Sequence, residues 1–462
     1  MTDHNDEFER SLTERLRASE ARVPGAAAPD LATIGSRSTR ARALAWGALV
    51  AGGGVATGLI VVLLLNDRPA PPTGEATATP HPTSSASETA TQSPSVTTSP
   101  APSGQEQLSV IPIAGLGSED EVRAIIEVDG RLIGVGRHGD QGAVWTSLDG
   151  GSWTLAPDLP ATEPLDYAAT TMTSIVQGPG GLVAVGTWQT IDVSTPRIWY
   201  STDGQRWTSV YGPSGFERIE ALAVGGPGYV AIGLASDDGF TGRPQVWTSA
   251  DGRDWTSMDS VGVTGSLNDV IGEAGMMVAV GGSGSAASSF VSTDGATWTA
   301  APEQGALQGA EMTSVAFRDG AFVATGALTG PGDTYPATPA IWHSRDGLNW
   351  SLVLQGESGQ RVSQAVSSDE GFVAIGGHFP SAGWSYDPAG QIPPSDTIQL
   401  WFSADGETWS GPTTGFLADG GINTLGQAII MGGDLFVPVT LLSAGPDGPV
   451  YQPAILRGPL PL

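Results

Sequence analysis

The residues best suited to chemistry lie in a few Gly-, Pro- and Ser-rich stretches that separate short apolar runs. The longest stretch, residues 376–399, combines aromatic rings, carboxylates and a histidine. Rings stack on the apolar faces of sugars and peptides, and carboxylates accept protons from hydroxyl and amine groups. The candidate ligand-binding residues are Trp188, Asp192, Asp237, Asp238, Arg243, Asp333, Tyr335, His378, Trp384, Tyr386 and Asp387. An open alternative is that the long stretch covers the fold, with Trp384 packed beneath it.

A second set of carboxylates recurs in a fixed pattern, aromatic-x-S-x-D-G-x-x-W. In a tight turn the Asp accepts hydrogen bonds from the backbone N–H groups that follow it, and the Gly supplies a positive φ. This pattern therefore predicts a scaffold role for these residues. The six copies contain Ser147, Asp149 and Trp153; Ser201, Asp203 and Trp207; Ser249, Asp251 and Trp255; Ser292, Asp294 and Trp298; Ser344, Asp346 and Trp350; and Ser403, Asp405 and Trp409.

These turns must be positioned by a repeated unit of about 50 residues, since successive Ser positions are 54, 48, 43, 52 and 59 residues apart. Each unit also holds a short apolar run that ends in Gly, such as LVAVG at 182–186. The order is strand, turn, apolar strand, loop, aromatic strand, S-x-D-G turn and a last strand. A period of this length with strand-like content predicts four-stranded antiparallel blades of a β-propeller.

The repeated turn resembles the Asp-box, or sialidase-type BNR repeat, in a variant form with Gly directly after Asp. Sialidases, sortilin-like receptors and photosystem II assembly factors share this repeat. The resemblance implies that the box lies between the third and fourth strands of each blade, on the face opposite the ligand site. Ligands are then expected at the loops between second and third strands and between consecutive blades.

The number of blades follows from the chain ends. After the sixth box, residues 422–442 supply two strands and 453–458 a third, and no box follows. We expect Leu108–Ile113 to pair with the strand around Ala454–Arg457 and to complete a seventh blade, which removes open strand edges. The side chains of Leu108, Val110, Ile111 and Ile113 are expected to make apolar contacts there. Residues 106–462 then form an all-β, seven-bladed propeller, with six blades and a separate tail as the alternative.

A sialidase needs three arginines for the substrate carboxylate, a Tyr–Glu nucleophile pair and a separate Asp acid. The F/Y-R-I-P motif that carries the first arginine is absent, while Arg123, Arg131 and Arg137 lie nearby without an assigned role. The five His residues are dispersed and the chain has no Cys, so no metal or cofactor site is expected. The sequence therefore favours a protein without enzyme activity, and it leaves the question of such activity open.

The N-terminal part predicts a membrane protein. Residues 43–65 hold no charged residue and are long enough to span a bilayer. Arg37, Arg40 and Arg42 precede this span, so the positive-inside rule keeps residues 1–42 in the cytoplasm and places the rest outside. This arrangement resembles the membrane anchors of actinobacterial single-pass proteins. Residues 66–105 are rich in Pro, Ser and Thr, which predicts a disordered stalk.

The amino-acid composition limits the classes of partner that this protein is expected to bind. All 20 basic residues are Arg, and the formal net charge of −28 argues against nucleic-acid binding. In the tail, Phe8, Leu12 and Leu16 have helical spacing, which fits either a docking helix for a cytoplasmic partner or a short solvated helix. The preferred function is a membrane-anchored module that binds a protein or glycan. A sialidase-like glycoside hydrolase and a transmembrane sensor that signals through the tail are the alternatives.

Overall fold

The computed structural model describes the C-terminal part of the chain with several gaps. The described residues are 108–111, 117, 119–156, 169–190, 194–210, 216–235, 242–258, 263, 265–273, 275–283, 285–328, 338–357, 360–378, 397–417, 421–445 and 448–460. The predicted tail (1–42), membrane span (43–65) and stalk (66–105) lie outside these residues. Within the described ranges, no helix is long and apolar enough to cross a bilayer.

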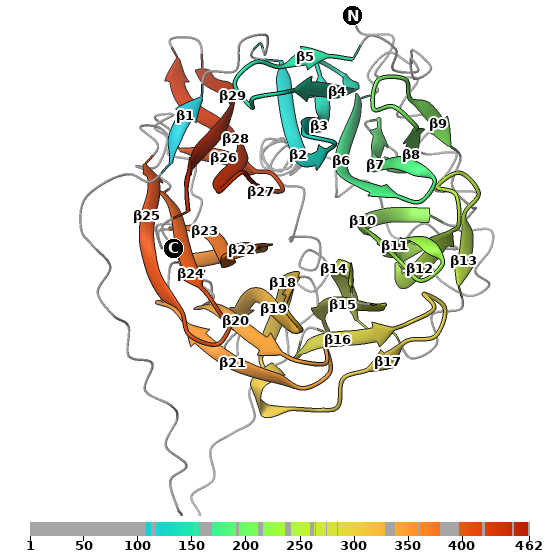
Figure 1. The fold of residues 1–462 in the computed structure, drawn as a ribbon, viewed down its shortest axis with the longest axis vertical. Helices are drawn as coiled ribbons and strands as arrows, with labels where there is room; N and C mark the ends of the chain where they lie inside the picture. The colour runs from blue at the N-terminus through green and yellow to red at the C-terminus, as the bar shows by residue number, and fades with distance from the viewer. Residues whose placement is uncertain are drawn as a thin grey trace, which may run out of the picture. The chain divides into compact units, whose positions relative to one another are not determined.

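Seven antiparallel sheets make up a seven-bladed β-propeller (Figure 1). Apolar second strands such as β7 are buried on both faces, because each blade packs between two others. Blades 1 to 3 contain β2 (Asp120–Val128), β3 (Arg131–His138), β4 (Gln141–Ser147), β5 (Thr154–Leu155); β6 (Ala169–Gly178), β7 (Gly181–Gln189), β8 (Ser194–Ser201), β9 (Thr208–Val210); and β10 (Phe216–Gly225), β11 (Gly228–Ala235), β12 (Arg243–Ser249), β13 (Thr256–Met258).

The next three blades repeat this order, and a short 3₁₀ turn, η2 (Gly305–Leu307), follows blade 4. Blades 4 to 6 contain β14 (Ser266–Glu273), β15 (Met276–Gly282), β16 (Ala287–Ser292), β17 (Thr299–Ala300); β18 (Ala310–Arg318), β19 (Ala321–Leu328), β20 (Thr338–Ser344), β21 (Trp350–Gln355); and β22 (Gln360–Ser368), β23 (Gly371–His378), β24 (Thr397–Ser403), β25 (Ser410–Leu417). The first strand of each blade lies innermost in the ring (Figure 1).

Blade 7 joins the two ends of the described chain. Its strands are β26 (Ile422–Leu425) with β27 (Ile429–Met431), β28 (Asp434–Gly445), β29 (Gly448–Pro459) and β1 (Ser109–Ile111). β1 pairs with β29 in the register Ser109↔Arg457, Val110↔Leu456 and Ile111↔Ile455, which confirms the predicted closure and excludes the six-bladed alternative. The pairing beyond residue 111 lies outside the described residues.

One expectation about the closing strand is wrong. Leu108 is buried, and its backbone N–H donates to the Gly415 carbonyl of blade 6 at 2.8 Å. Val110, which was expected to contribute apolar contacts, is 36% exposed. By alternation Leu108 and Val110 share one side of the strand. Leu108 packs in the apolar cluster between blades 6 and 7, whereas Val110 is not part of it.

The hydrophobic core is divided among the joints between blades. Seven apolar clusters are found among the described residues, and each joins two neighbouring blades. The cluster between blades 7 and 1 packs Phe436 and Ile455 against Val122, Trp145 and Trp153. The ring is therefore closed by side-chain packing as well as by strand pairing.

Each innermost strand shifts its pairing register by one residue near the same position, so the blades repeat even at their inner edge. The residues at these shifts are all polar and half-buried: Arg123, Thr173, Glu220, Asn268, Thr313, Ser363 and Asn423. A bulge adds a residue to one strand and changes the direction of its side chain. The inner edge of the ring is consequently polar in every blade.

Candidate functional site

The blades have two different ends, which we name by their connections. The box face carries the S-x-D-G-x-x-W turns between third and fourth strands, and the loop face carries the connections between second and third strands and between blades. Of the predicted ligand-binding residues, Trp188, Arg243 and His378 are described, and all three lie at the loop-face ends of strands. The others, Asp192, Asp237, Asp238, Asp333, Tyr335, Trp384, Tyr386 and Asp387, lie outside the described residues.

Trp188 lies in β7, opposite Thr170 on one side and Thr195 on the other. Its ring is half-buried, and the guanidinium carbon of Arg197 stands 5.7 Å from the ring centroid. Arginine stacked on an aromatic ring is a favourable cation–π arrangement. One side of this ring therefore contacts its own blade.

Arg243 begins β12 and is exposed, and its Nη1 donates to Gln245 Oε1. Gln245 is buried, and its amide nitrogen donates to the Val246 carbonyl at 3.0 Å and also to the Met258 carbonyl. His378 ends β23, where it pairs with Gln360 and Thr397. Arg243 and His378 belong to blades 3 and 6, so the structure does not bring them together in one blade.

Blade 1 holds a charged cluster at its loop-face end. The carboxylate of Glu121 is 5% exposed and lies between two guanidinium groups. Arg137 Nε donates to Glu121 Oε2 at 2.8 Å, and Arg123 Nε lies 2.8 Å from Oε1 at an angle outside hydrogen-bond geometry. Two arginines against one carboxylate give these three side chains a formal charge of +1. We name Arg123 and Arg137, which share the Glu121 carboxylate, the arginine pair.

The arginine pair keeps part of its surface open, since the Arg123 and Arg137 side chains are 21% and 41% exposed. Among the described residues, the only side-chain hydrogen bond that Arg137 makes is the one from Nε. A guanidinium fixed through Nε still presents its Nη hydrogens, which match the two oxygens of a carboxylate or sulfate. The arrangement can therefore hold an oxyanion.

A second pair lies next to it on the same two strands. His138 Nδ1 lies 2.5 Å from Asp120 Oδ1, and Asp120 Oδ2 accepts from the Gly117 backbone N–H at 2.5 Å. The Asp120 carboxylate is 3% exposed, whereas the His138 ring is 56% exposed. A carboxylate that holds Nδ1 leaves Nε2 for a ligand or solvent.

The register between β2 and β3 creates both pairs, since it places Asp120 opposite His138 and Glu121 opposite Arg137. Sequence reasoning left Arg123 and Arg137 without a role and did not single out Asp120, Glu121 or His138. The signal was present as DEVR (120–123) and GRH (136–138) at the two ends of one predicted hairpin. Opposite charges that face each other across antiparallel strands are a recognised pairing preference.

A third charged pair lies on the innermost strand of blade 3, where Arg218 contacts Glu220. Burial raises the pKa of the Glu220 carboxyl, and the charge of Arg218 opposes that rise. On blades 4 and 6, polar side chains of the innermost strands are bonded to the next blade instead. Asn268 donates to the Met312 carbonyl at 2.8 Å, and Gln364 donates to the Gly426 carbonyl at 2.8 Å. Blades 1 and 3 thus carry Arg–Glu ion pairs on their innermost strands.

The six box turns have one common geometry. In each, Asp Oδ1 accepts the N–H groups two and three residues later at 2.7–3.0 Å, and Ser Oγ accepts the Gly N–H at 2.8–2.9 Å. The Trp indole N–H donates to the Gly carbonyl at 2.9–3.2 Å. Each Gly has a φ between 70° and 78°.

These bonds set the protonation of the box carboxylates. The backbone N–H groups of Thr297 and Ala296 lower the pKa of Asp294 to about 2. Asp346 also has a pKa of about 2, because the bonds from Asn349 and Leu348 outweigh the effect of burial. A carboxylate held this firmly in the ionised form is a poor general acid. Catalysis by a box carboxylate is therefore not supported by this geometry.

Within the described ranges, no group of three or more His, Asp and Glu side chains is arranged to hold a metal ion. The box turn of blade 4 forms a shallow recess with Thr293, Thr297 and Thr299, next to Asp294. It lies on the box face and contains no cationic side chain, so it is unlike the arginine pair.

Comparison with solved structures returns β-propellers at low similarity. The phage phi92 endosialidase aligns with a TM-score of 0.46 and 12% identity, covering 77% of this chain and 70% of that one. Trypanosoma rangeli sialidase gives 0.39 and 15% identity, with 67% and 56% covered. YCF48 bound to D1 peptide gives 0.43 and 16% identity, with 79% and 99% covered. No protein-family model and no curated protein matches the chain.

Proposed function

We propose that this chain is a membrane-anchored, extracytoplasmic propeller of the Asp-box type that binds a protein or glycan ligand at its loop face. The observation that carries the proposal is the arginine pair, which places two guanidinium groups at the loop-face end of an otherwise acidic protein. The ligand group that fits them is an oxyanion, such as the carboxylate of an acidic sugar or peptide. The box face supports the same conclusion, because its carboxylates are occupied by their own turns.

Binding by the full-length chain to acidic and neutral glycans and peptides tests this proposal. We expect the double variant Arg123→Met/Arg137→Met to weaken binding of an acidic ligand about 10- to 100-fold, since two charge-assisted hydrogen bonds are lost. Arg206→Met is the matched control, because Arg206 lies in a box turn and its side chain is 81% exposed. The proposal fails if the double variant binds as tightly as Arg206→Met, or if the wild-type chain binds no acidic ligand.

The second candidate function is a sialidase-like glycoside hydrolase. It is favoured by the same arginine pair, since sialidases grip a substrate carboxylate with arginines. No hydrogen bond between a Tyr and a Glu side chain is found among the described residues. Release of a fluorophore from a sialoside by the wild-type chain, abolished in Arg123→Met/Arg137→Met, would favour the hydrolase over the binding module.

The membrane anchor is part of the proposal and rests on residues 43–65 and the three arginines before them. The chain has no Cys, so a single introduced thiol reports its own side of the membrane. In intact cells, a membrane-impermeant maleimide should label Ser95→Cys in the stalk and leave Ser11→Cys in the tail unlabelled. The reverse labelling pattern would show the opposite membrane orientation. If neither cysteine is labelled in lysed cells, both thiols are buried and the experiment contradicts an exposed tail and stalk.

A further inference from the structure

A buried histidine lies at the joint between blades 5 and 6, on the box face and away from the proposed ligand site. His343 is in β20, directly before the box residue Ser344, and is 8% exposed. Its Nε2 has no hydrogen-bond partner among the described residues. Buried polar atoms in proteins are nearly always bonded, so an unpartnered ring nitrogen needs an explanation.

The box turn of blade 6 lies against this ring. A Cβ added at Gly406 would lie 3.3 Å from His343 Cδ2, which shows how closely the turn packs on the imidazole. The nearest carboxylate oxygen is Glu407 Oε1, 3.7 Å from Nε2. That distance is about 0.7 Å beyond an ordinary N–H···O hydrogen bond. A small movement of the Glu407 side chain would therefore bring its carboxylate within hydrogen-bond distance of Nε2 in a protonated ring.

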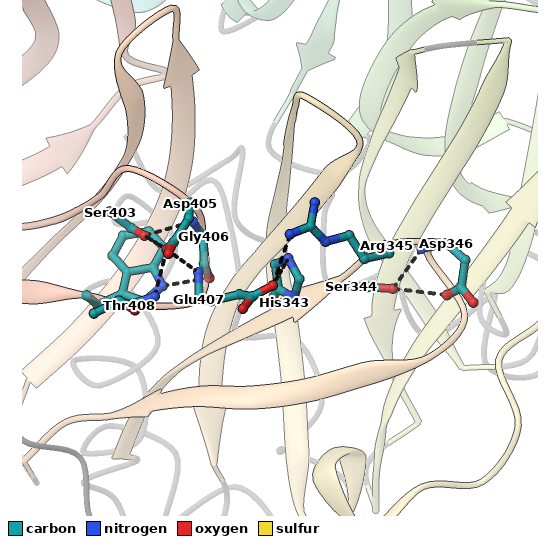
Figure 2. A network of polar contacts seen from close by, with 10 residues as sticks. His343, Ser344, Arg345, Asp346, Ser403, Asp405, Gly406, Glu407 and Thr408 are labelled. Atoms are coloured by element: carbon teal, nitrogen blue, oxygen red, sulfur yellow. Dashed lines mark hydrogen bonds and ion pairs between the residues drawn. The ribbon is translucent and has the colours of Figure 1, made fainter.

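Glu407 already has another partner. Its Oε1 accepts from Arg345 Nη2 at 3.0 Å, so one carboxylate oxygen faces both Arg345 and His343 of blade 5 (Figure 2). The side chains of Glu407 and Arg345 are 52% and 60% exposed. An ion pair this exposed contributes little to stability and is readily exchanged.

Hydrogen bonds hold the rest of the blade 6 turn next to His343. Asp405 Oδ1 accepts the backbone N–H groups of Glu407 and Thr408, each at 2.8 Å, and the hydroxyl of Ser403 at 3.1 Å. Arg318, at the end of β18, donates to the Ala404 and Asp369 carbonyls of blade 6 at 2.8 and 2.6 Å. The turn backbone is thus held while the Glu407 side chain is free to change partner.

Burial lowers the pKa of His343, Glu407 and Asp405 raise it, and Arg345 lowers it, with a net value below the ordinary one. The ring is therefore neutral at neutral pH. An unfolded histidine titrates near 6.5, so as the pH falls the unfolded chain binds its proton first. Folding stability from this group is complete above about pH 6.5 and is lost as the pH falls toward the lower folded pKa.

We propose that His343 is a proton switch: in a mildly acidic medium it becomes charged and draws Glu407 away from Arg345. Acid then replaces an exposed Arg345–Glu407 contact by a buried His343–Glu407 contact at the joint between blades 5 and 6. The switch is independent of the proposed ligand site, since it lies on the opposite face of the blades.

The test measures the titration of individual imidazoles by histidine hydrogen–deuterium exchange and mass spectrometry on the full-length chain in detergent. The variants are Glu407→Gln and Arg345→Gln, whose exposed side chains should leave the fold intact. We expect Glu407→Gln to lower the His343 midpoint, and Arg345→Gln to raise it, each by about 0.5 pH unit or more. The exposed His138 on blade 1 is the internal control and should not move.

Two results would overturn the switch: a wild-type His343 midpoint at or above the ordinary value, or a midpoint that does not change in Glu407→Gln. A second measurement guards against indirect effects. The melting temperature of the wild-type chain should fall more between pH 7.5 and pH 5.5 than that of His343→Phe, and equal slopes would also contradict the proposal.

Discussion

Blades 6 and 7 form similar antiparallel sheets by different means. In blade 6 the third and fourth strands, β24 and β25, are joined by the box turn at Ser403–Trp409, which satisfies its own backbone groups. In blade 7 the outermost strand is β1, which lies more than 300 residues away in the chain from its partner β29. The comparison shows that one sheet edge can be completed by local turn chemistry or by a distant segment.

A single arginine supports the joint where blade 7 has no box turn. Arg457 Nε donates to Asp434 Oδ2 at 2.6 Å, and Nη1 donates to the Asp149 carbonyl of the first box turn at 3.4 Å. Its guanidinium lies 5.1 Å from the centroid of the Phe436 ring. Long-range closure therefore depends on strand pairing and on side-chain contacts between distant residues, whereas a box turn depends on hydrogen bonds between residues close in sequence.

The largest expected effect comes from removing the distant strand. Deleting residues 106–113 should lower the free energy of unfolding by roughly 4 kcal/mol or more, since Leu108 leaves the core and β29 loses its partner. Deleting 70–100, in the predicted stalk, should leave the melting temperature unchanged. Chemical denaturation of both variants measures the difference, and equal losses would show that the closure does not stabilise the ring.

The next effect tests how tightly a box turn packs on its neighbour. A Cβ at Gly150 would lie 2.5 Å from Phe436 Cε1, and its φ is 72°. Gly150→Ala should cost about 2–4 kcal/mol from overpacking and backbone strain together. Gly432→Ala is the control, with a φ of 61° and nothing within 4 Å, and should cost only about 1 kcal/mol. Equal melting temperatures for the two variants would show that the loss of stability comes from backbone strain alone and not from overpacking against Phe436.

A smaller effect is expected at the joint between blades 7 and 1. Arg457→Met should lower the free energy of unfolding by about 1 kcal/mol, because the Arg457 side chain is 41% exposed and solvent screens its ion pair. Arg206→Met, at a side chain that is 81% exposed, should lower it by less. If Arg457→Met is silent, strand pairing and apolar packing close the ring without a contribution from this arginine.

The smallest effect concerns pH. The folded pKa of Asp294, about 2, lies below the ordinary value of 3.8, so the stability from its turn bonds is full above about pH 4 and is lost as the pH falls toward 2. Asp294→Asn should flatten the acid side of the stability curve over this window. Thermal unfolding from pH 5 to pH 2 measures it, and an unchanged slope would mean that another group controls the acid response.

Much of the fold was predictable because it follows from a sequence pattern that repeats along the chain. Six copies of S-x-D-G-x-x-W and the apolar runs before them fixed the blade type, the position of the turns and, with the strands after the last copy, the seventh blade. The partners of the closing strand were also predicted. The exposure of Val110 was not, because sequence alone does not show how far along an outer strand the neighbouring blade covers its side chains.

The site was less predictable. The predicted loops contain aromatic and acidic residues of the expected kind, and only Trp188, Arg243 and His378 among them lie in described positions. The arginine pair was missed because neither Arg123 nor Arg137 belongs to a motif. Their shared carboxylate, Glu121, becomes evident only when the register of β2 and β3 is known.

The sequence by itself therefore determined what depends on neighbours in the chain: strands, tight turns with Asp and Gly, and the number of repeats. These features follow from backbone geometry and hydrogen bonds within a few residues. The tertiary structure decided which charges meet across strands and blades, as at Glu121 between two arginines and at Glu407 between Arg345 and His343. Such pairs arise from packing between segments that no local pattern connects, so only the assembled ring brings them within reach of one another.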